Sequence, residues 1–439
     1  MPRVCAVLVI LGVALGAHGA GDPKVHTAGR PNVLLIVLDT VRFDAISPAN
    51  TPFLDSLGKR AIVFPQAYST HDFTPPSHFS MMTGLRDGMA TDDDRMENGV
   101  AWQLRQNGYS TFATVANGLI TPRQMPVLSG FGDFKVLGDT GGSDSIDMMS
   151  DLTTIDERLA LFHVGATPHT RAMLYYSAER VLPAFLQQIR SAKPPFFGFV
   201  NLVDAHEPYV PNPESYHPEA NLPKNFVGDV MRRPLTREMQ QPETIQDPRR
   251  RALVTAKIAE VGFARLLSLD LSPEALAIYK ARYMATVHDL DGVLRQFFNA
   301  AEHDHLLDNT IVIITSDHGE EFGEAGHITH MLRDHGDFEV THHVPLIVIL
   351  PRSITPHGAS VVNRRISLAS LPATIYDVAG VDWSPLAGRY DDYPRSLTPL
   401  FMTLPPRVAI VMLPANAPQD HSGADREREE AMRALGYFQ

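Results

Sequence analysis

The sequence predicts an α/β fold in which helices cover both faces of a largely parallel sheet. Apolar runs occur at 33–38, 195–203 and 310–315, and each leads into an aspartate. Segments with helical periodicity, at 176–189 and 276–301, alternate with these runs. Strands that are buried on both faces read as continuous apolar runs, and their alternation with helices is typical of parallel sheets.

Shorter elements continue the alternation. A helix is predicted from Pro52 to Arg60, because proline at the first helical position loses no hydrogen bond. A helix over 102–106 and a strand over 110–115 follow. The segment from about 212 to 272 breaks the rhythm, because it is punctuated by prolines and mostly helical in pattern. We interpret it as an insertion over one edge of the sheet.

Composition favours one large core. The chain has 439 residues, 44% of them hydrophobic, and a formal net charge of −12. This charge disfavours nucleic acid as a partner, since such binding needs basic surface. An acidic pocket would instead suit cations. No obligate protein partner is implied, and residues 383–439 are expected to form a C-terminal tail or small subdomain.

Residues 1–20 have the layout of a signal peptide, with Arg3 before an apolar run over 4–17. The run is shorter than the ~20 residues that a membrane-spanning helix needs. We therefore expect a secreted or periplasmic protein, which would be membrane-anchored if the leader were retained. The only cysteine, Cys5, lies in this leader, so the mature chain would contain no thiol.

Polar residues follow three predicted strands at the edge where sites form in parallel sheets. They are Asp39, Asp204, His206, Asp317 and His318. Each aspartate alone is more often a turn or helix cap than a ligand. Carboxylates and imidazoles from several strand ends are costly to bring together without a cation, so the set predicts a metal site.

Several segments, in order, resemble one known family. They are RPNVLLIVLDTVRFDAI (30–46), TPPSHFSMMTGL (74–85), PPFFGFVNLVDAHEPYVP (194–211), LLDNTIVIITSDHGEEFGEAGH (306–327), HHVPLIVILP (342–351) and ISLASLPATIYDVAGV (366–381). The chain resembles the sulfatase branch of the alkaline phosphatase superfamily. The resemblance implies a three-layer αβα alkaline phosphatase-like fold, a catalytic domain over 30–382 and a small C-terminal subdomain. It also implies a metal-dependent ester hydrolase or transferase.

Thr74 stands where sulfatase-like enzymes carry a cysteine or serine that is oxidised to formylglycine. A threonine can attack directly but cannot become formylglycine. Pro75 and Pro76 suit the start of a helix, whose free N–H groups favour anions. An alternative is that Thr74 only caps this helix.

The resemblance implies a metal site built from Asp39, Thr74 through its oxygen, Asp317 and His318. This mixed oxygen and nitrogen set is compatible with Mn²⁺ or Zn²⁺ and less suited to Ca²⁺. Thr40 replaces the second aspartate of many calcium-binding sulfatases. One ion is favoured. A second would be held by Asp204, His206 and His335.

Other residues are predicted to face the substrate. His206 resembles the histidine that contacts the transferred group and protonates the leaving oxygen. His78 either orients the bound group or hydrogen-bonds within its helix, and Asn117 either stabilises the anion or forms a turn. His335 is the predicted anion contact, but the spacing leaves His327 and His330 open.

The favoured function is cleavage of a phosphoryl or related anionic ester by Thr74, as in phosphatases and phosphodiesterases, without formylglycine. The substrate would be a small ester, lipid- or glycan-linked in some cases. One alternative is a sulfuric ester hydrolase that works without formylglycine. Another is a catalytically inactive protein that keeps the fold and a metal.

Overall fold

The computed structural model describes residues 29–86, 95–137, 176–206, 209, 211–212, 273–325, 328–330, 338–354, 360–389, 394–402 and 408–409. The predicted signal peptide, almost all of the predicted insertion and most of the C-terminal segment lie outside these ranges. Those three interpretations stay predictions. Within the described ranges, no helix combines the length and the apolar character needed to cross a bilayer.

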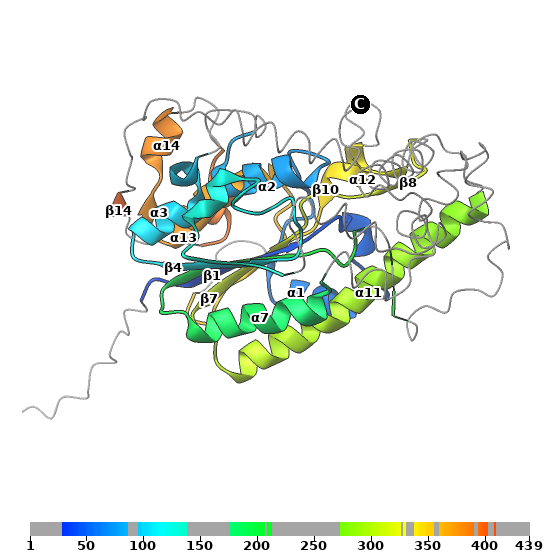
Figure 1. Cartoon of the computed structure of the whole chain (residues 1–439), viewed down its shortest axis with the longest axis horizontal. Helices are drawn as coiled ribbons and strands as arrows, with labels where there is room; N and C mark the ends of the chain where they lie inside the picture. Colours follow the sequence, from blue (N-terminus) through cyan, green and yellow to red (C-terminus); the bar gives the residue numbers. More distant parts are fainter. Residues whose placement is uncertain are drawn as a thin grey trace, which may run out of the picture.

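A seven-stranded sheet forms the centre of the molecule, in the order β2-β11-β7-β1-β6-β4-β5 (Figure 1). Its strands are β1 (Asn32–Leu38), β2 (Ile62–Val63), β4 (Ser110–Val115), β5 (Asp133–Val136), β6 (Phe196–Leu202), β7 (Thr310–Thr315) and β11 (Leu346–Ile349). The five strands from β7 to β5 are parallel, whereas β11 runs antiparallel to both β7 and β2. The prediction of a largely parallel sheet is confirmed.

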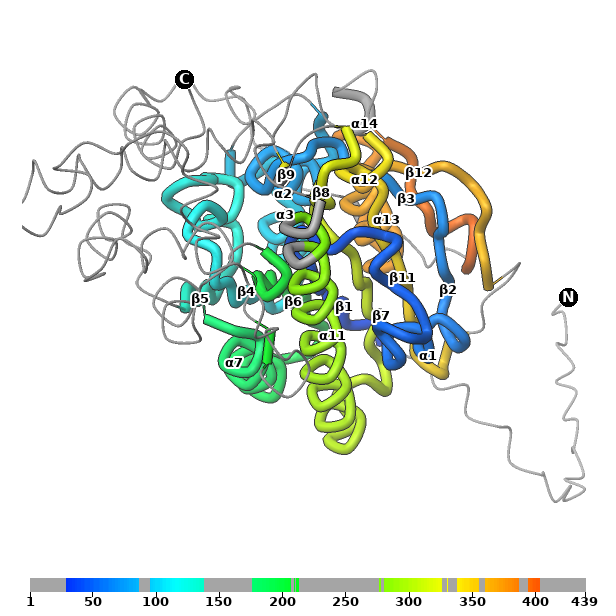
Figure 2. The backbone as a smooth tube through the Cα atoms, turned by 90° about the vertical axis from the view of Figure 1, so that its right-hand side faces the viewer, coloured from blue at the N-terminus to red at the C-terminus, as the bar shows by residue number. Residues whose placement is uncertain are grey.

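Helices cover both faces of this sheet, which makes three layers (Figure 1). One face carries α1 (Pro52–Gly58), α7 (Ala178–Ser191) and α11 (Pro273–His303). The other carries α2 (Thr74–Thr83), α3 (Val100–Gln106) and α13 (Leu371–Val378). Figure 2 shows α7 and α11 side by side along the first face. The predicted helices and strands are confirmed, with small differences at their ends.

The central strand β1 divides its side chains between the two layers. Val33, Leu35 and Val37 pack into the core under α2 and α13, because alternate residues of a strand point to opposite faces. The intervening apolar residues pack into the core under α7 and α11. A Cβ at Gly198 of the neighbouring strand would lie 2.6 Å from the Phe112 ring, so glycine is needed for this close packing.

Small elements surround the carboxyl ends of the parallel strands. They are the sheet β10-β3-β12 (His343–Val344, Ala67–Tyr68 and Ile366–Ser367), the hairpin of β8 (Glu321–Phe322) and β9 (Ile328–Thr329), and the short helix α12 (Phe338–His342). Farther along the chain, β13 (Val381–Asp382) pairs with β14 (Val408–Ala409).

Candidate active site

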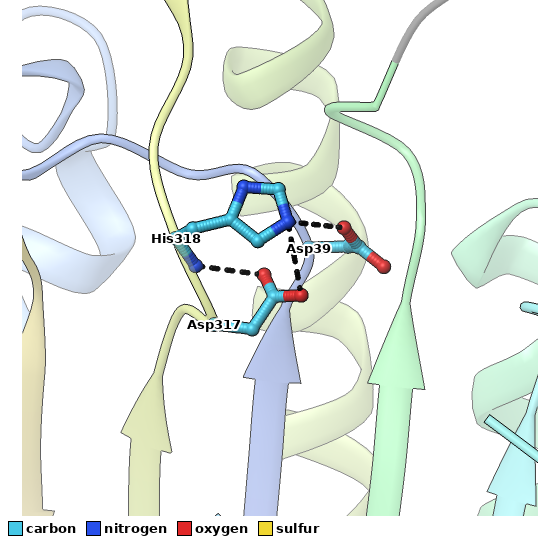
Figure 3. A group of neighbouring side chains, drawn as sticks. All are labelled: Asp39, Asp317 and His318. Atoms are coloured by element: carbon cyan, nitrogen blue, oxygen red, sulfur yellow. Dashed lines mark hydrogen bonds and ion pairs between the residues drawn. The ribbon is translucent and has the colours of Figure 1, made fainter. Parts of the chain in front are cut away.

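Three buried side chains meet where β1 and β7 end. These strands are parallel and in register, with Val37 opposite Thr315, so the residues that follow them come together. Ligand atoms of Asp39, Asp317 and His318 all lie within 4.8 Å of one another (Figure 3). The predicted convergence of strand-end carboxylates and an imidazole is therefore present.

Backbone N–H groups hold the Asp317 carboxylate from one side. Its Oδ1 accepts hydrogen bonds from the N–H of Thr40, at 3.1 Å, and from that of His318, at 3.0 Å. Thr40 has a φ of 60°, a left-handed conformation that is unusual for a residue with a branched side chain. In this conformation the chain turns away from β1, and the Thr40 N–H points at Asp317.

Two amide side chains hold Asp39. Its Oδ2 accepts from Asn117 Nδ2 at 3.1 Å and from Asn201 Nδ2 at 3.2 Å. The remaining oxygens, Asp39 Oδ1 and Asp317 Oδ2, are buried and accept no hydrogen bond from the described residues. Buried acceptors normally have partners, and these two lie within the cluster of ligand atoms. A cation between them would satisfy both.

The tautomer of His318 follows from its surroundings. Its Nδ1 lies 3.0 Å from the Gly319 carbonyl oxygen, which can only accept, so Nδ1 carries the proton. Nε2 therefore keeps its lone pair, and it lies 3.4 Å from Asp317 Oδ2 and 4.0 Å from Asp39 Oδ1. Burial, with the nearby imidazole of His330 as a smaller cause, holds the pKa of His318 well below its ordinary value. A neutral imidazole is suited to binding a metal.

The charges at this point also fit a cation. Burial raises the pKa of Asp317 well above its ordinary value, and the neighbouring Asp39 carboxylate raises it further. The buried Asp317 carboxylate therefore resists ionisation unless positive charge lies beside it. The donor set of two carboxylates and one imidazole is compatible with Mn²⁺ or Zn²⁺. The site fits a divalent cation held by Asp39, Asp317 and His318.

Thr74 points into this cluster. It is the first residue of α2, it is almost completely buried, and its Oγ1 lies 3.1 Å from His318 Nε2. The residue at the cap position is Phe73, and no side chain caps the helix. The alternative that Thr74 only caps α2 is therefore wrong. Ser77, one turn later, donates from Oγ to the Asp317 carbonyl at 2.7 Å and fixes α2 against the end of β7.

His78 is fully buried beneath Thr74. Its Nδ1 donates to the Thr74 carbonyl at 2.9 Å, and Asn201 Nδ2 lies 3.4 Å from its Nε2. Burial lowers the pKa of His78, although the Asp39 carboxylate opposes this effect. Of the two interpretations of His78, the structure shows the hydrogen bond within the helix.

A second pair of histidines lies beside the cluster. His206 follows β6, and its ring centroid lies 5.1 Å from that of His330. The His330 ring in turn lies 4.4 Å from the His318 ring. Among the three histidines that the sequence leaves open, the structure thus places His330 at the site. His327 and His335 lie outside the described residues.

Comparison with known proteins decides the family. The sulfatase family profile matches residues 31–381. This chain belongs to the sulfatase family. It is 25% identical to human arylsulfatase K over 423 residues, covering 90% of this chain and 70% of that protein. It is 24% identical to the N-acetylglucosamine-6-O-sulfatase of Bacteroides thetaiotaomicron over 417 residues, covering 84% of this chain and 71% of that protein. It spans 63% of the length of arylsulfatase K from Xenopus laevis.

Solved structures show the same fold. The phosphonate monoester hydrolase of Agrobacterium radiobacter aligns with a TM-score of 0.52 and 23% identity, covering 80% of this chain and 74% of that one. A structure in complex with its substrate D-glucosamine-2-N,6-O-disulfate aligns with a TM-score of 0.56 and 20% identity, covering 86% of this chain and 81% of that one. The predicted alkaline phosphatase-like architecture is confirmed.

Within this sulfatase-family site, the strand-end residue Asp204 contacts the start of α7. Its Oδ2 accepts from the N–H of Ala178, at 2.9 Å, and so caps the start of α7. In the described part of the chain, only Asp39, Asp317 and His318 form a group that could hold a metal. The second ion predicted on Asp204, His206 and His335 stays a prediction.

Two further residues join the site without having been singled out from the sequence. Asn201 is an amide in an otherwise apolar strand, and this isolated polar residue was the signal for it. Its Nδ2 contacts both Asp39 and His78. Glu320 is buried two residues after His318 and accepts a hydrogen bond from His330 Nδ1 at 3.1 Å. Asn117 also has its predicted turn role, since its Oδ1 accepts from the N–H of Leu119 at 2.9 Å.

Proposed function

We propose that this sulfatase-family protein is a metal-dependent hydrolase, or transferase, that cleaves phosphoryl or related anionic esters with Thr74 as the nucleophile. One observation carries the proposal: the Thr74 hydroxyl lies 3.1 Å from His318 Nε2, beside the cluster of carboxylates. The family position of the modified cysteine or serine is a threonine, and the only cysteine is Cys5. Formylglycine therefore cannot form at this position.

Asp39, Asp317 and His318 would hold the cation, with the Thr74 oxygen beside them. A bound divalent cation would lower the pKa of a neighbouring hydroxyl and stabilise negative charge on the ester oxygens. The amides of Asn117 and Asn201 keep Asp39 in place. The site is thus organised before substrate arrives.

The reaction would proceed by in-line attack. Thr74 Oγ1, having lost its proton to solvent, forms a bond to the phosphorus or sulfur atom while the bond to the leaving oxygen breaks. The dipole of α2 favours an anion beside Thr74. Pro75 and Pro76 have no N–H, and that of Ser77 donates to the Phe73 carbonyl, so the helix acts here through its dipole more than through free N–H groups. Water or an acceptor hydroxyl then displaces the threonine oxygen, which regenerates Thr74.

The two histidines beside the cluster would act in the reaction. His206 would protonate the leaving oxygen as a general acid, and His330 would accept a hydrogen bond, through Nε2, from the water or acceptor hydroxyl that displaces the threonine oxygen. Both are buried at the carboxyl end of the sheet, and their rings lie 5.1 Å apart. The anion contact predicted for His335 stays a prediction, since His335 lies outside the described residues.

A sulfuric ester hydrolase is the second candidate, and the names of the relatives favour it. Human arylsulfatase K and the bacterial N-acetylglucosamine-6-O-sulfatase are both named for sulfate esters. Sulfate and phosphoryl esters have similar shapes and differ in charge. The natural substrate would be a small anionic ester, lipid- or glycan-linked, that a secreted or periplasmic enzyme meets.

The test is an assay of the purified protein on a phosphate monoester, a phosphodiester, a phosphonate monoester and a sulfate ester, with its metal content measured. Thr74→Ala is assayed in parallel. Phosphoryl or phosphonate turnover that is lost in Thr74→Ala supports the proposal. Turnover of the sulfate ester alone would establish the second candidate. Equal activity of both proteins on every ester would exclude Thr74, and no turnover by either would favour an inactive metal-binding protein.

A further inference from the structure

Glu320 connects two loops at the edge of the site. Its carboxylate is fully buried, and each oxygen accepts a hydrogen bond from a different segment. Oε2 accepts from the Tyr209 hydroxyl at 2.8 Å, and Oε1 accepts from His330 Nδ1 at 3.1 Å. Tyr209 lies three residues after His206 in the sequence. Glu320 therefore lies between the two loops that bear the substrate-facing histidines.

These contacts determine which ring nitrogen of His330 carries the proton. The Glu320 carboxylate accepts and does not donate, so Nδ1 of His330 carries the proton. Nε2 then carries the lone pair. The His330 ring is buried, and its centroid lies 4.4 Å from that of His318 and 5.1 Å from that of His206.

The Glu320 carboxylate is itself held rigidly. The Tyr209 ring packs edge-on against Tyr283, at a centroid distance of 5.5 Å, and in a tilted arrangement against Phe322, at 5.9 Å. The Tyr283 hydroxyl donates to the Thr40 carbonyl at 3.0 Å, directly after the metal ligand Asp39. Tyr209 and Glu320 are thus fixed to the same turn that positions the metal cluster.

We propose that Glu320, braced by Tyr209, is a positioning residue that fixes the tautomer and ring orientation of His330, so that the lone pair of Nε2 is presented to the attacking water or acceptor hydroxyl. Glu320 touches neither ester nor metal in this scheme and acts through His330. This inference rests on the proposed function, which assigns His330 a hydrogen bond from the attacking water or acceptor hydroxyl. Carboxylates that orient metal-binding imidazoles are worth roughly 10–100-fold in metal affinity or activity, and we expect an effect of that size on the activity that His330 supports.

The first test is spectroscopic and does not depend on turnover. The full chain is loaded with Zn²⁺ and labelled with ¹⁵N-histidine, and His330→Gln assigns the ring signals of His330. We expect the wild type to carry its proton on Nδ1 and Glu320→Ala to lose this single tautomer. A wild-type His330 protonated on Nε2 would overturn the proposal. So would an unchanged tautomer in Glu320→Ala.

The second test is kinetic, at equal bound zinc. We expect kcat/KM to fall about 10–100-fold in Glu320→Ala, to recover in part in Glu320→Gln, whose amide oxygen can still accept from His330, and to fall less in Tyr209→Phe. Tyr109→Phe is the matched control, because the Tyr109 hydroxyl donates to the Pro31 carbonyl at 2.9 Å, at the opposite end of β1. Equal losses in both tyrosine variants would indicate a structural role only and contradict the proposal.

The two tests separate this inference from the proposed function. If the wild type turns over no ester while the Nδ1 tautomer responds to Glu320→Ala, the proposed function fails and the Glu320–His330 arrangement stands. If Thr74→Ala abolishes turnover while Glu320→Ala changes neither tautomer nor kcat/KM, the proposed function stands and the positioning role fails.

Discussion

Asp39 and Asp317 lie side by side at the ends of neighbouring strands, each with one buried oxygen that accepts no hydrogen bond from the described residues. Folding raises the pKa of Asp317 above its ordinary 3.8, chiefly through burial. In the metal-free protein, the resulting stabilisation is complete below that ordinary pKa and is lost as pH rises through the raised value.

Asp317→Asn should therefore make the metal-free protein more stable, and the difference from wild type should widen as pH rises from 4 towards neutrality. Asparagine keeps an oxygen for the two N–H donors and removes the charge. The measurement is thermal unfolding in chelator at several pH values. Added Zn²⁺ should raise the Tm of the wild type and leave that of the variant unchanged. A stability difference that shrinks with rising pH would show that burial does not disfavour the ionised Asp317 carboxylate.

Thr74→Val should lower kcat by at least about 10⁴-fold, because valine keeps the branched shape and lacks the attacking oxygen. Thr74→Ser should retain activity, since the hydroxyl is preserved. Steady-state kinetics on the best ester of the panel measure both. Comparable rates for the valine and serine variants would assign the attack to another group.

Asn201→Ala should weaken metal binding by about 10–100-fold, because its amide holds the Asp39 oxygen that faces away from the cluster. Asn117→Ala should weaken metal binding similarly. Because both amides donate to the same oxygen, the double variant should lose less binding free energy than the sum of the two single losses. Titration calorimetry with Zn²⁺ measures the three affinities. Asn309→Ala, which loses an amide contact to Gly29 outside the site, is the control and should bind like the wild type.

Chelation should abolish activity, and Zn²⁺ or Mn²⁺ should restore it while an equal concentration of Ca²⁺ should not. The reason is the neutral imidazole of His318, which suits transition metals better than a cation that favours oxygen. Activity and bound metal are measured after each addition. Full recovery with Ca²⁺ would contradict the predicted preference.

Gly319→Ala should destabilise the protein by at least about 2 kcal/mol, because a Cβ there would lie 1.9 Å from the Val340 carbonyl oxygen. Its control is Gly292→Ala in α11, where a Cβ would meet nothing within 4 Å and should stabilise by about 0.5–1 kcal/mol. Urea unfolding of the two variants gives both values. Similar stabilities would show that α12 can move away from Gly319.

Much of the fold was predictable because local pattern and position agree. The run at 310–315 is an apolar segment between polar ends, the segment at 110–115 is rich in β-branched and aromatic residues, and the strands match both. Asp39, Asp317 and His318 were predictable because parallel strands bring their carboxyl ends to one edge. The helix predicted over 276–301 extends further at both ends, to Pro273–His303, because terminal turns are polar and lack apolar periodicity.

The remaining parts of the site depend on contacts between distant segments. Asn201 reaches Asp39 only because β6 lies beside β1. Glu320 gains its partners from two loops whose positions no local pattern encodes. Asp204 follows a strand as Asp39 does, yet one of its oxygens caps α7, since a strand-end aspartate can serve a helix as well as a cation.

The placement of β1 between β6 and β7 has a consequence for how the chain is made. The strand is synthesised among the first described residues, but its partner β7 begins only at Thr310. A nascent chain therefore carries this buried, apolar strand with an unpaired edge until more than two thirds of the sequence has been synthesised. Such long-range pairing slows folding and exposes the strand to aggregation. The cation site, divided between β1 and β7, can form only after translation has passed His318.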